Sequence, residues 1–386
     1  MGQSQNIHLW VPGMEETGGI QHYSICLAQA LSELLPDSSI DVLSKNDCGR
    51  SIDIERVAVH EFGHLPRSLR TAAFAAKGLA MAAIEKPAVL IATHPHFAKA
   101  MRWSHRPYLA VAHGVETWGN LGGALGVALR QAAGVLPVSE FTRQVLLREG
   151  GLDPNKVIVV PDTFREAAFA PGPKPDYLLA RHGLRSDQPV LLTVGRLAAS
   201  EAYKGHDQVI AAMPGIRRSH PDVRYVIVGA GDDLARLQAC AVSHGQEDAV
   251  IFAGFIPDHE LADYYRLCDA FVMPSTGEGF GIVYLEALAS GRPCIVGNQD
   301  ASPEAIGNGR LGFVVNPRSP HEIVAAVTQL LSRQHDKPWL HEPETLRSEV
   351  IRLYGFQAFR SHLARALRPL VPALELRTEN SSPCVA

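Results

Sequence analysis

The 386-residue sequence lacks several features that would place it in a specialised class of protein. No uninterrupted apolar run approaches the roughly 18 residues that a membrane-spanning helix needs, so we expect no such helix. The opening MGQSQNIHLW has no basic stretch followed by an apolar core, which predicts no secretory signal peptide. A formal net charge of −4 argues against a general nucleic-acid binder. The composition, with 46% hydrophobic and 20% charged residues, indicates a soluble globular protein that is long enough for two domains.

Cysteine is scarce, and the sequence contains no convincing metal-ligand spacing. None of the six cysteines lies in a CxxC or Cys/His pattern, so we expect free thiols in a reducing cytoplasm. His94 and His96 lie two residues apart, but no third ligand accompanies them at a suitable spacing, and we interpret them as loop residues. Asp232 and Asp233 precede a helical stretch and are expected to cap it. The sequence therefore predicts no metal site.

Short apolar runs of strand length alternate with longer helical stretches, and this pattern occurs twice. Such alternation is typical of parallel sheets covered by helices on both faces. We predict an α/β protein with two Rossmann-like, doubly wound domains at 1–165 and 166–342, facing a central cleft. The run VIVVP at 157–161 is counted among the strands of the first domain. Residues 343–370 are expected to form helices that cross back to the first domain, followed by a disordered tail at 371–386.

The segment EGFGIVYLE, from Glu278 to Glu286, is the most informative part of the sequence. It follows an apolar strand and contains the glycine-rich start of a helix. The unpaired N–H groups and the positive dipole end of a helix start attract phosphate. Glu278 falls just outside the predicted helix and Glu286 about five residues inside it, roughly 7–8 Å along the axis. A ligand with an anionic centre and hydroxyl groups at both ends fits this layout, as a nucleotide diphosphate-sugar does.

Ligands of doubly wound sheets bind beyond the carboxyl ends of the strands, and this rule selects further loops. Gly195 and Arg196 follow the first strand of the second domain, and Lys204 precedes the next helix. Together the two cations would neutralise the charge on a departing diphosphate, although each alone is better explained as a solvated surface cation or a helix-capping partner. In the first domain, Gly18 and Gly19 lie between a strand and a helix, where a phosphate or only a tight turn would require them.

These motifs, taken in order, resemble those of glycosyltransferase family 4, the retaining nucleotide-sugar enzymes with the GT-B fold. The ordered matches are the Gly18-Gly19 loop, His113-Gly114, VSEFT at 138–142, GRL at 195–197, YKG at 203–205, VGAG at 228–231 and EGFGIVYLE. The similarity is to hexosyl- or mannosyltransferases of exopolysaccharide or lipopolysaccharide synthesis. It implies GDP-mannose or a UDP-sugar as donor and a saccharide or lipid-linked acceptor. Two departures are the insertion AASEAY between Arg196 and Lys204, and Asp162-Thr163 where the family often has Asn-Gly.

The resemblance also assigns roles to individual residues. Glu278 would contact the transferred sugar, Glu286 the ribose hydroxyls, and Arg196 and Lys204 the diphosphate. The other expected donor contacts are largely with the backbone, at Gly18, Gly19, Gly195, Phe255, Ile256, Gly279, Phe280, Gly281 and Ile282. The last four would offer amides to the diphosphate, and Phe255 and Ile256 would meet the base. No second carboxylate is placed for a covalent intermediate, which favours transfer with retention on one face of the sugar and without a metal.

His113 ends an apolar run of strand length, so the strand-end rule places it at the predicted cleft. A lone histidine at such a position is ordinarily a packed or surface residue. Its position and the resemblance together favour a functional role, in which His113 hydrogen-bonds the sugar near the reacting centre.

The stretch at 66–110 has seven Lys or Arg residues against one acid, which gives it a net charge of +6. Its segment LPRSLRTAAFAAKGLAMAAI mixes these cations with an apolar face. Two interpretations stay open: a helix that rests on an anionic inner leaflet, or a solvated helix packed on the sheet.

Other classes of function also stay open at this point. A GT-B epimerase or phosphorylase would act on the same ligands without an acceptor alcohol, and a non-catalytic sugar-binding protein would retain the cleft. A nicotinamide-dependent oxidoreductase is disfavoured, because neither VPGMEETGG nor VGAGDD supplies the GxGxxG pattern.

Overall fold

The computed structural model describes residues 6–15, 18–49 and 53–371. Thr17, beside the Gly18-Gly19 loop, and residues 372–386 of the expected tail lie outside this described part. The chain forms two compact units. The first contains the residues up to Thr163 together with those from Phe356 onward, and the second is Phe164–Gly355.

The first unit is built on a six-stranded parallel sheet with the order β3-β2-β1-β4-β5-β6. The strands are β1 (Ile7–Val11), β2 (Ile40–Ser44), β3 (Val57–Glu61), β4 (Val89–Ala92), β5 (Tyr108–Ala112) and β6 (Gly134–Pro137). Its α-helices are α1 (Gly19–Leu34), α2 (Arg67–Glu85), α3 (Ala98–Met101), α4 (Gly123–Gln131), α5 (Glu140–Gly150) and α14 (Phe356–Leu367). The short 3₁₀ turns are η1 (Pro95–Phe97) and η2 (Pro154–Lys156). The predicted strand at 157–161 does not form as a regular strand: Ile158 and Val160 donate to carbonyls of β6, but the segment makes only one isolated bridge, between Val135 and Val157.

The second unit has a second parallel sheet with the order β12-β11-β10-β7-β8-β9. Its strands are β7 (Val190–Val194), β8 (Arg224–Val228), β9 (Val250–Gly254), β10 (Ala270–Met273), β11 (Cys294–Gly297) and β12 (Gly312–Val315). Its α-helices are α6 (Asp176–His182), α7 (His206–Ser219), α8 (Leu234–Ser243), α9 (Asp258–Leu267), α10 (Ile282–Ala289), α11 (Ser302–Ala305), α12 (Pro320–Leu331) and α13 (Pro343–Tyr354). The 3₁₀ turns are η3 (Glu166–Ala168), η4 (Ala199–Lys204) and η5 (Pro338–His341).

Most inner strands are buried along their whole length, as their apolar sequences require. Every residue of β1, β4, β5, β10 and β11 is buried. In the first sheet, Leu9 pairs with Val42 on one side and Ile91 on the other, so the apolar core is continuous across the sheet. Helices on both faces exclude water from these strands, which explains why they are apolar throughout rather than alternating. The predicted class of two doubly wound parallel sheets is confirmed.

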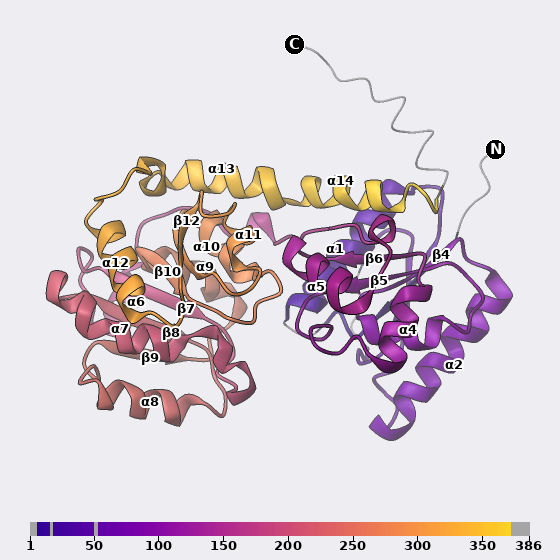
Figure 1. The fold of residues 1–386 in the computed structure, drawn as a ribbon, viewed down its shortest axis with the longest axis horizontal. Helices are drawn as coiled ribbons and strands as arrows, with labels where there is room; N and C mark the ends of the chain where they lie inside the picture. The colour runs from indigo at the N-terminus through magenta and orange to yellow at the C-terminus, as the bar shows by residue number, and fades with distance from the viewer. Residues whose placement is uncertain (1–5, 16–17, 50–52, 372–386) are drawn as a thin grey trace, which may run out of the picture. The chain divides into compact units, whose positions relative to one another are not determined.

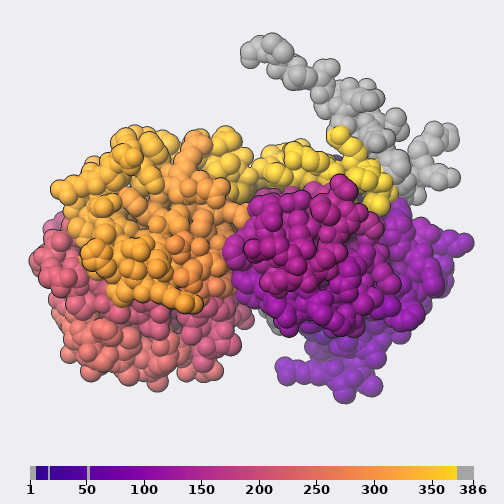
Figure 2. All heavy atoms as spheres, viewed as in Figure 1, coloured from indigo at the N-terminus to yellow at the C-terminus, as the bar shows by residue number. Residues whose placement is uncertain are grey.

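The predicted helical stretch at 343–370 divides at Gly355 into α13 and α14. A Cβ atom at this glycine would lie 2.5 Å from the carbonyl oxygen of Ile351. Helix α14 packs on α1 within the first unit, where the rings of Tyr23 and Phe359 are 5.3 Å apart. Figure 1 shows α14 along α1, and in Figure 2 the yellow end of the described chain lies against indigo and magenta atoms of the same unit. The end of the described chain thus completes the first unit.

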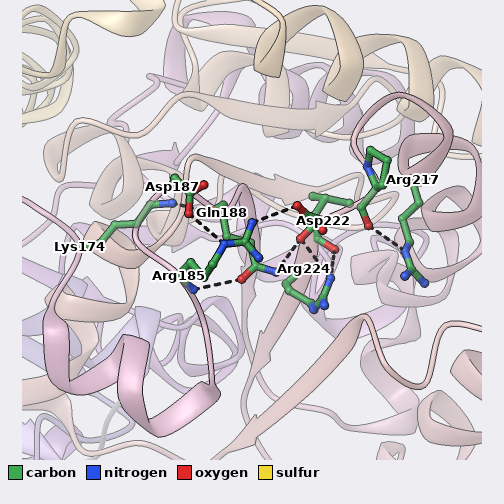
Figure 3. A network of polar contacts seen from close by, with 9 residues as sticks. Lys174, Arg185, Asp187, Gln188, Arg217, Asp222 and Arg224 are labelled. Atoms are coloured by element: carbon green, nitrogen blue, oxygen red, sulfur yellow. Dashed lines mark hydrogen bonds and ion pairs between the residues drawn. The ribbon is translucent and has the colours of Figure 1, made fainter.

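Charged residues also gather at the amino ends of the strands of the second sheet (Figure 3). Lys174 donates to the Gln188 carbonyl at 2.7 Å, and the Gln188 side chain donates to the Asp222 carbonyl at 2.7 Å. Arg185 donates to the Asp222 carboxylate at 2.9 Å. These contacts satisfy backbone groups before β7 and β8, which is a structural role at the edge opposite the predicted ligand-binding loops.

The described cysteines are free thiols, as expected; they are Cys26, Cys48, Cys240, Cys268 and Cys294. Cys384 lies outside the described residues. Among the helices that the structure describes, none combines the length and the apolar character needed to cross a bilayer.

Candidate functional site

The loop between β10 and α10 carries Glu278 and ends in a backbone conformation that favours glycine. Gly281 has φ +97° at the N-cap of α10, and a Cβ atom there would lie 2.4 Å from the Tyr284 ring. The helix begins at Ile282, so Glu278 lies just before it and Glu286 in its second turn, as predicted. With no side chain at Gly281 to cap it, this end of the helix presents its N–H groups and positive dipole end.

Asp300 holds the same loop at Glu278 through a backbone hydrogen bond. The Glu278 N–H donates to Asp300 Oδ2 at 2.7 Å, and the Ser302 N–H donates to Asp300 Oδ1 at 2.9 Å. Asp300 is buried, and burial raises its pKa while these hydrogen bonds oppose the shift. Asp300 carries no local signal in the sequence, because its contact with Glu278 is made across 22 residues.

The Lys204 ammonium lies between two carboxylates. Its Nζ is 3.0 Å from Glu201 Oε2 and 3.5 Å from Glu278 Oε1. All three side chains are largely buried, with exposed fractions of 10–16%. Burial raises the pKa of Glu278, and Lys204 opposes that shift. Burial also lowers the pKa of Lys204, but Glu278, Tyr203 and Glu201 outweigh it, so the pKa rises and the ammonium stays charged.

Arg196 lies beside the group formed by Lys204, Glu201 and Glu278. Its guanidinium pairs with Glu201 Oε1, and its side chain is 81% exposed. Gly195 lies against the Lys204 side chain, since a Cβ atom there would be 3.2 Å from Lys204 Cδ. The structure therefore brings Gly195, Arg196, Lys204 and Glu278 together and adds Glu201, which the sequence analysis noted only as part of the AASEAY insertion.

Glu286 is half-buried in α10 and accepts a hydrogen bond from a tyrosine of α9. The Tyr265 hydroxyl donates to Glu286 Oε2 at 2.7 Å. Burial raises the pKa of Glu286 to about 7, and the hydrogen bond from Tyr265 opposes part of the shift. A carboxyl group with this pKa is poised between hydrogen-bond donor and acceptor at neutral pH.

An apolar pocket of about 220 Å³ lies beyond the carboxyl ends of β7 and β8. It brings together four predicted residues, Gly195, Arg196, Phe255 and Ile256. Phe255 is 77% exposed, so it lines the pocket and is not part of the core. The other lining residues are Val194, Val228, Gly229, Ala230, Asp258 and Leu261. An apolar slot next to a cation suits a flat ring attached to an anionic group.

Phe280 contributes its backbone rather than its side chain. Its ring is buried against Tyr354, with centroids 5.2 Å apart. The amides of Gly279, Phe280, Gly281 and Ile282 are thus held in a segment anchored by the Phe280 ring on one side and Asp300 on the other.

Gly18, Gly19 and His113 belong to the first unit. Gly18 holds the N-cap of α1, and a Cβ atom there would lie 2.4 Å from Gln21 Oε1. His113 follows β5, and its Nε2 lies 2.8 Å from the Thr93 carbonyl, to which it donates as the protonated nitrogen. Its ring also packs edge-on against Tyr23 at 5.0 Å. These contacts fix the imidazole and leave Nδ1 as the atom for a further hydrogen bond.

Two expectations about capping and loop residues meet different outcomes. Asp233 holds the N-cap position of α8, but its carboxylate accepts from Arg236 at 2.7 Å and does not cap the helix, so this part of the prediction is wrong. Asp232 instead accepts from the Ala199 N–H at the start of η4. His94 caps the short turn η1 through its Nδ1, and burial lowers its pKa to about 4.

Within the described residues, one His/carboxylate group has atoms close enough for a metal, namely His8, Asp41 and Glu85 within 4.8 Å. His8 and Asp41 lie at the amino ends of β1 and β2, where His8 already bonds Glu85 at 2.7 Å. The predicted donor-site residues follow the carboxyl ends of strands, so this group is separate from them.

Two doubly wound parallel sheets, with a helix start that no side chain caps beyond the second sheet, are typical of the GT-B class of two-domain proteins. Residues 17–163 match the family described as Glycosyltransferase Family 4, and residues 178–342 match Glycosyl transferases group 1. The two matches together span most of the chain, which therefore belongs to the glycosyltransferases of family 4, also described as group 1. This result confirms the predicted family and the GT-B fold.

Individual relatives agree with this assignment. A Mycolicibacterium smegmatis protein named GDP-mannose-dependent alpha-(1-6)-phosphatidylinositol monomannoside mannosyltransferase is 34% identical over 246 residues, or 60% of this chain and 63% of the relative. The chain thus matches somewhat less than two thirds of that relative's length. D-inositol 3-phosphate glycosyltransferase of Acidothermus cellulolyticus is 27% identical, covering 92% of this chain and 84% of its own. The structure of sucrose-phosphate synthase from Thermosynechococcus elongatus superposes with a TM-score of 0.76 at 21% identity, covering 96% of this chain and all of that one.

Proposed function

We propose that the chain is a retaining hexosyltransferase that moves a hexose from a nucleotide diphosphate-sugar to an acceptor hydroxyl. The observation that carries the proposal is the Lys204 ammonium, held against Glu278 at the start of α10 with Arg196 beside it. The acceptor class that we propose is a lipid-linked saccharide of cell-surface polysaccharide synthesis. GDP-mannose is the first donor to test, because the M. smegmatis relative is named for it.

The donor diphosphate would lie on Arg196, Lys204 and the amides from Gly279 to Ile282. This arrangement combines two cations with a helix dipole, and both favour an anion. The apolar pocket at Phe255 and Ile256 would take the base.

Ribose and sugar would lie on either side of the diphosphate. Glu286 would accept hydrogen bonds from the ribose hydroxyls at its half-buried position in α10. Glu278 would accept a hydrogen bond from a hydroxyl of the transferred sugar. His113 would hydrogen-bond the sugar near the reacting centre.

The proposed reaction proceeds on one face of the sugar. The bond from the anomeric carbon to the diphosphate breaks, and a bond to the acceptor oxygen forms on the same face. The acceptor proton passes to an oxygen of the departing diphosphate. Arg196, Lys204 and the helix start would stabilise the charge on that leaving group, so we propose that the reaction requires no metal.

A panel of UDP-, GDP- and dTDP-sugars, scored for binding and hydrolysis and then with acceptor alcohols, tests this function. We expect one nucleotide to bind selectively and its turnover to depend on an acceptor. Turnover of the donor without an acceptor alcohol would favour an epimerase or phosphorylase, and binding without turnover would favour a sugar-binding protein.

We also propose peripheral contact with an anionic membrane through α2 and the segment after α3. Leu69 and Ile84 on α2 are 60% and 80% exposed, and Trp103 is 65% exposed. Lys77 and Lys86 are exposed on or next to the same helix. Arg70 and Arg106 are engaged with backbone carbonyls, so fewer than seven cations face solvent freely. Exposed apolar side chains among cations are typical of helices that rest on a bilayer surface.

A further inference from the structure

Glu201 holds both cations of the proposed donor site, and this arrangement has a consequence for donor binding. One carboxylate oxygen pairs with Arg196, and the other lies 3.0 Å from Lys204 Nζ. Glu201 is 8% exposed, so its charge is poorly screened by water. A carboxylate that spans two cations in this way has the charge and reach of two phosphate oxygens.

We propose that Glu201 is an internal counter-anion that occupies the diphosphate subsite and competes with the donor. This inference rests on the proposed function, because it requires that Arg196 and Lys204 bind a diphosphate. The ion pair between Glu201 and Arg196 would break when the donor binds and form again when the nucleoside diphosphate leaves.

The local charges indicate that Glu201 competes with the donor diphosphate and does more than keep Lys204 charged. Arg196 and Lys204 supply two positive charges, and Glu201 and Glu278 supply two negative ones, so the group is balanced without a ligand. A diphosphate adds at least two negative charges at the same cations. Unless Glu201 gives way, the like charges repel at short range in a poorly hydrated site.

The two contacts of Glu201 differ in how easily they break. The Arg196 side chain is 81% exposed, so water readily replaces Glu201 around the guanidinium. The Lys204 contact is enclosed, with exposed fractions of 14% and 10%. Arg196 is therefore the partner that leaves Glu201 for the donor.

The AASEAY insertion holds Glu201 in this position. The Glu201 N–H donates to the Ala198 carbonyl at 2.8 Å, and the Ala199 N–H donates to Asp232 at 2.8 Å. Glu201 has φ −112° and ψ 19°, which interrupts the turn η4 at this residue. The loop is thus anchored to the neighbouring VGAGDD loop, and the carboxylate is directed at the cations.

Calorimetric titration of the full chain with GDP, UDP and dTDP, and with guanosine and uridine as uncharged probes, tests the proposal. We expect Glu201→Gln to bind the nucleoside diphosphate about tenfold more tightly, which corresponds to roughly 1.4 kcal/mol. Binding of the uncharged nucleoside should not change, because the competition acts only on the diphosphate. Asp248→Asn is the matched control, since it removes one acid that pairs with Arg217 elsewhere in the same unit.

Glu201→Asp provides a second test if the glutamine variant folds poorly, as judged by circular dichroism. Its shorter side chain keeps the charge but no longer spans both cations, so we expect an intermediate gain in affinity. If a folded Glu201 variant binds the diphosphate no more tightly than the wild-type chain, the proposal that Glu201 is a competing counter-anion is overturned. Absence of GDP, UDP and dTDP binding by the wild-type chain overturns the proposed function itself.

Discussion

At the scale of single residues, Lys204 lies where a departing diphosphate would need positive charge. Lys204→Met should lower kcat roughly 100- to 1000-fold and donor affinity much less, because its charge matters most as the leaving group forms. Steady-state kinetics with the donor found by the panel would measure both. A larger loss of donor affinity than of kcat would contradict this role.

Lys174 offers the matched control for that experiment. It is as enclosed as Lys204, with a 12% exposed side chain, and it pairs with Asp269 at 2.7 Å. It lies at the amino edge of the sheet, however, so Lys174→Met should reduce stability and leave kcat nearly unchanged. Thermal unfolding of the two variants separates the structural cost, which they share, from the catalytic one.

The pKa of Glu286 predicts a pH dependence of donor binding. Burial raises this pKa to about 7, and the ionised carboxylate is the form that accepts ribose hydroxyls. The donor KM should therefore fall as pH rises through about 7. Tyr265→Phe removes the hydrogen bond that favours ionisation, so it should move the inflection to higher pH. An unchanged inflection in that variant would contradict the assignment to Glu286.

Stability should follow the opposite course in the unliganded protein. A carboxyl group whose pKa is raised by folding stabilises the fold below its ordinary pKa of 4.5, and this contribution is lost as pH rises towards 7. Urea unfolding at several pH values would measure this contribution, with Glu286→Gln as the variant in which it is absent.

At the scale of elements, the start of α10 depends on Gly281. Gly281→Ala combines a left-handed conformation with a contact of 2.4 Å to the Tyr284 ring, so we expect a loss of more than about 2 kcal/mol of stability. Donor binding should also weaken, because the amides before the helix would shift. Urea unfolding and calorimetry would measure the two effects.

Gly183→Ala is the control that measures the cost of the left-handed backbone conformation without a steric contact. Gly183 has φ +62° at the C-cap of α6, and a Cβ atom there would meet nothing within 4 Å. It should lose only about 1 kcal/mol and keep donor binding. Equal losses in the two variants would show that the contact with Tyr284 is unimportant.

The boundaries of elements show how far local sequence reasoning extends. The segment at 157–161 has an apolar, β-branched sequence like a strand, and Ile158 and Val160 donate to the carbonyls of Val135 and Pro137 on β6. Pro137 has no N–H to return a bond, so only the isolated bridge from Val157 to Val135 forms. A regular ladder needs donors and acceptors from both strands, and the pattern of one segment does not show which strand lies beside it. Gly355 similarly divides a stretch that is helical by pattern throughout.

At the scale of the whole molecule, the proposed membrane contact predicts salt-sensitive association with anionic vesicles. We expect the full chain to sediment with vesicles containing phosphatidylserine at low salt and to be released at high salt. Leu69→Ser with Ile84→Ser should reduce binding several-fold. Val242→Ser is the control, since Val242 is a 63% exposed apolar residue on α8 of the second unit. Equal binding by neutral vesicles would contradict the proposal.

The amino-acid pattern alone predicts the repeated strands and helices, the two parallel sheets, and the position of Glu278 and Glu286 around the start of α10. Apolar runs and helix periodicity are local properties of the chain. The tertiary structure decided what faces those residues. Glu201, Asp300 and Tyr265 reach the site through contacts that loop composition does not specify. Their effect is electrostatic, and burial and distance set its strength, which only the folded chain fixes.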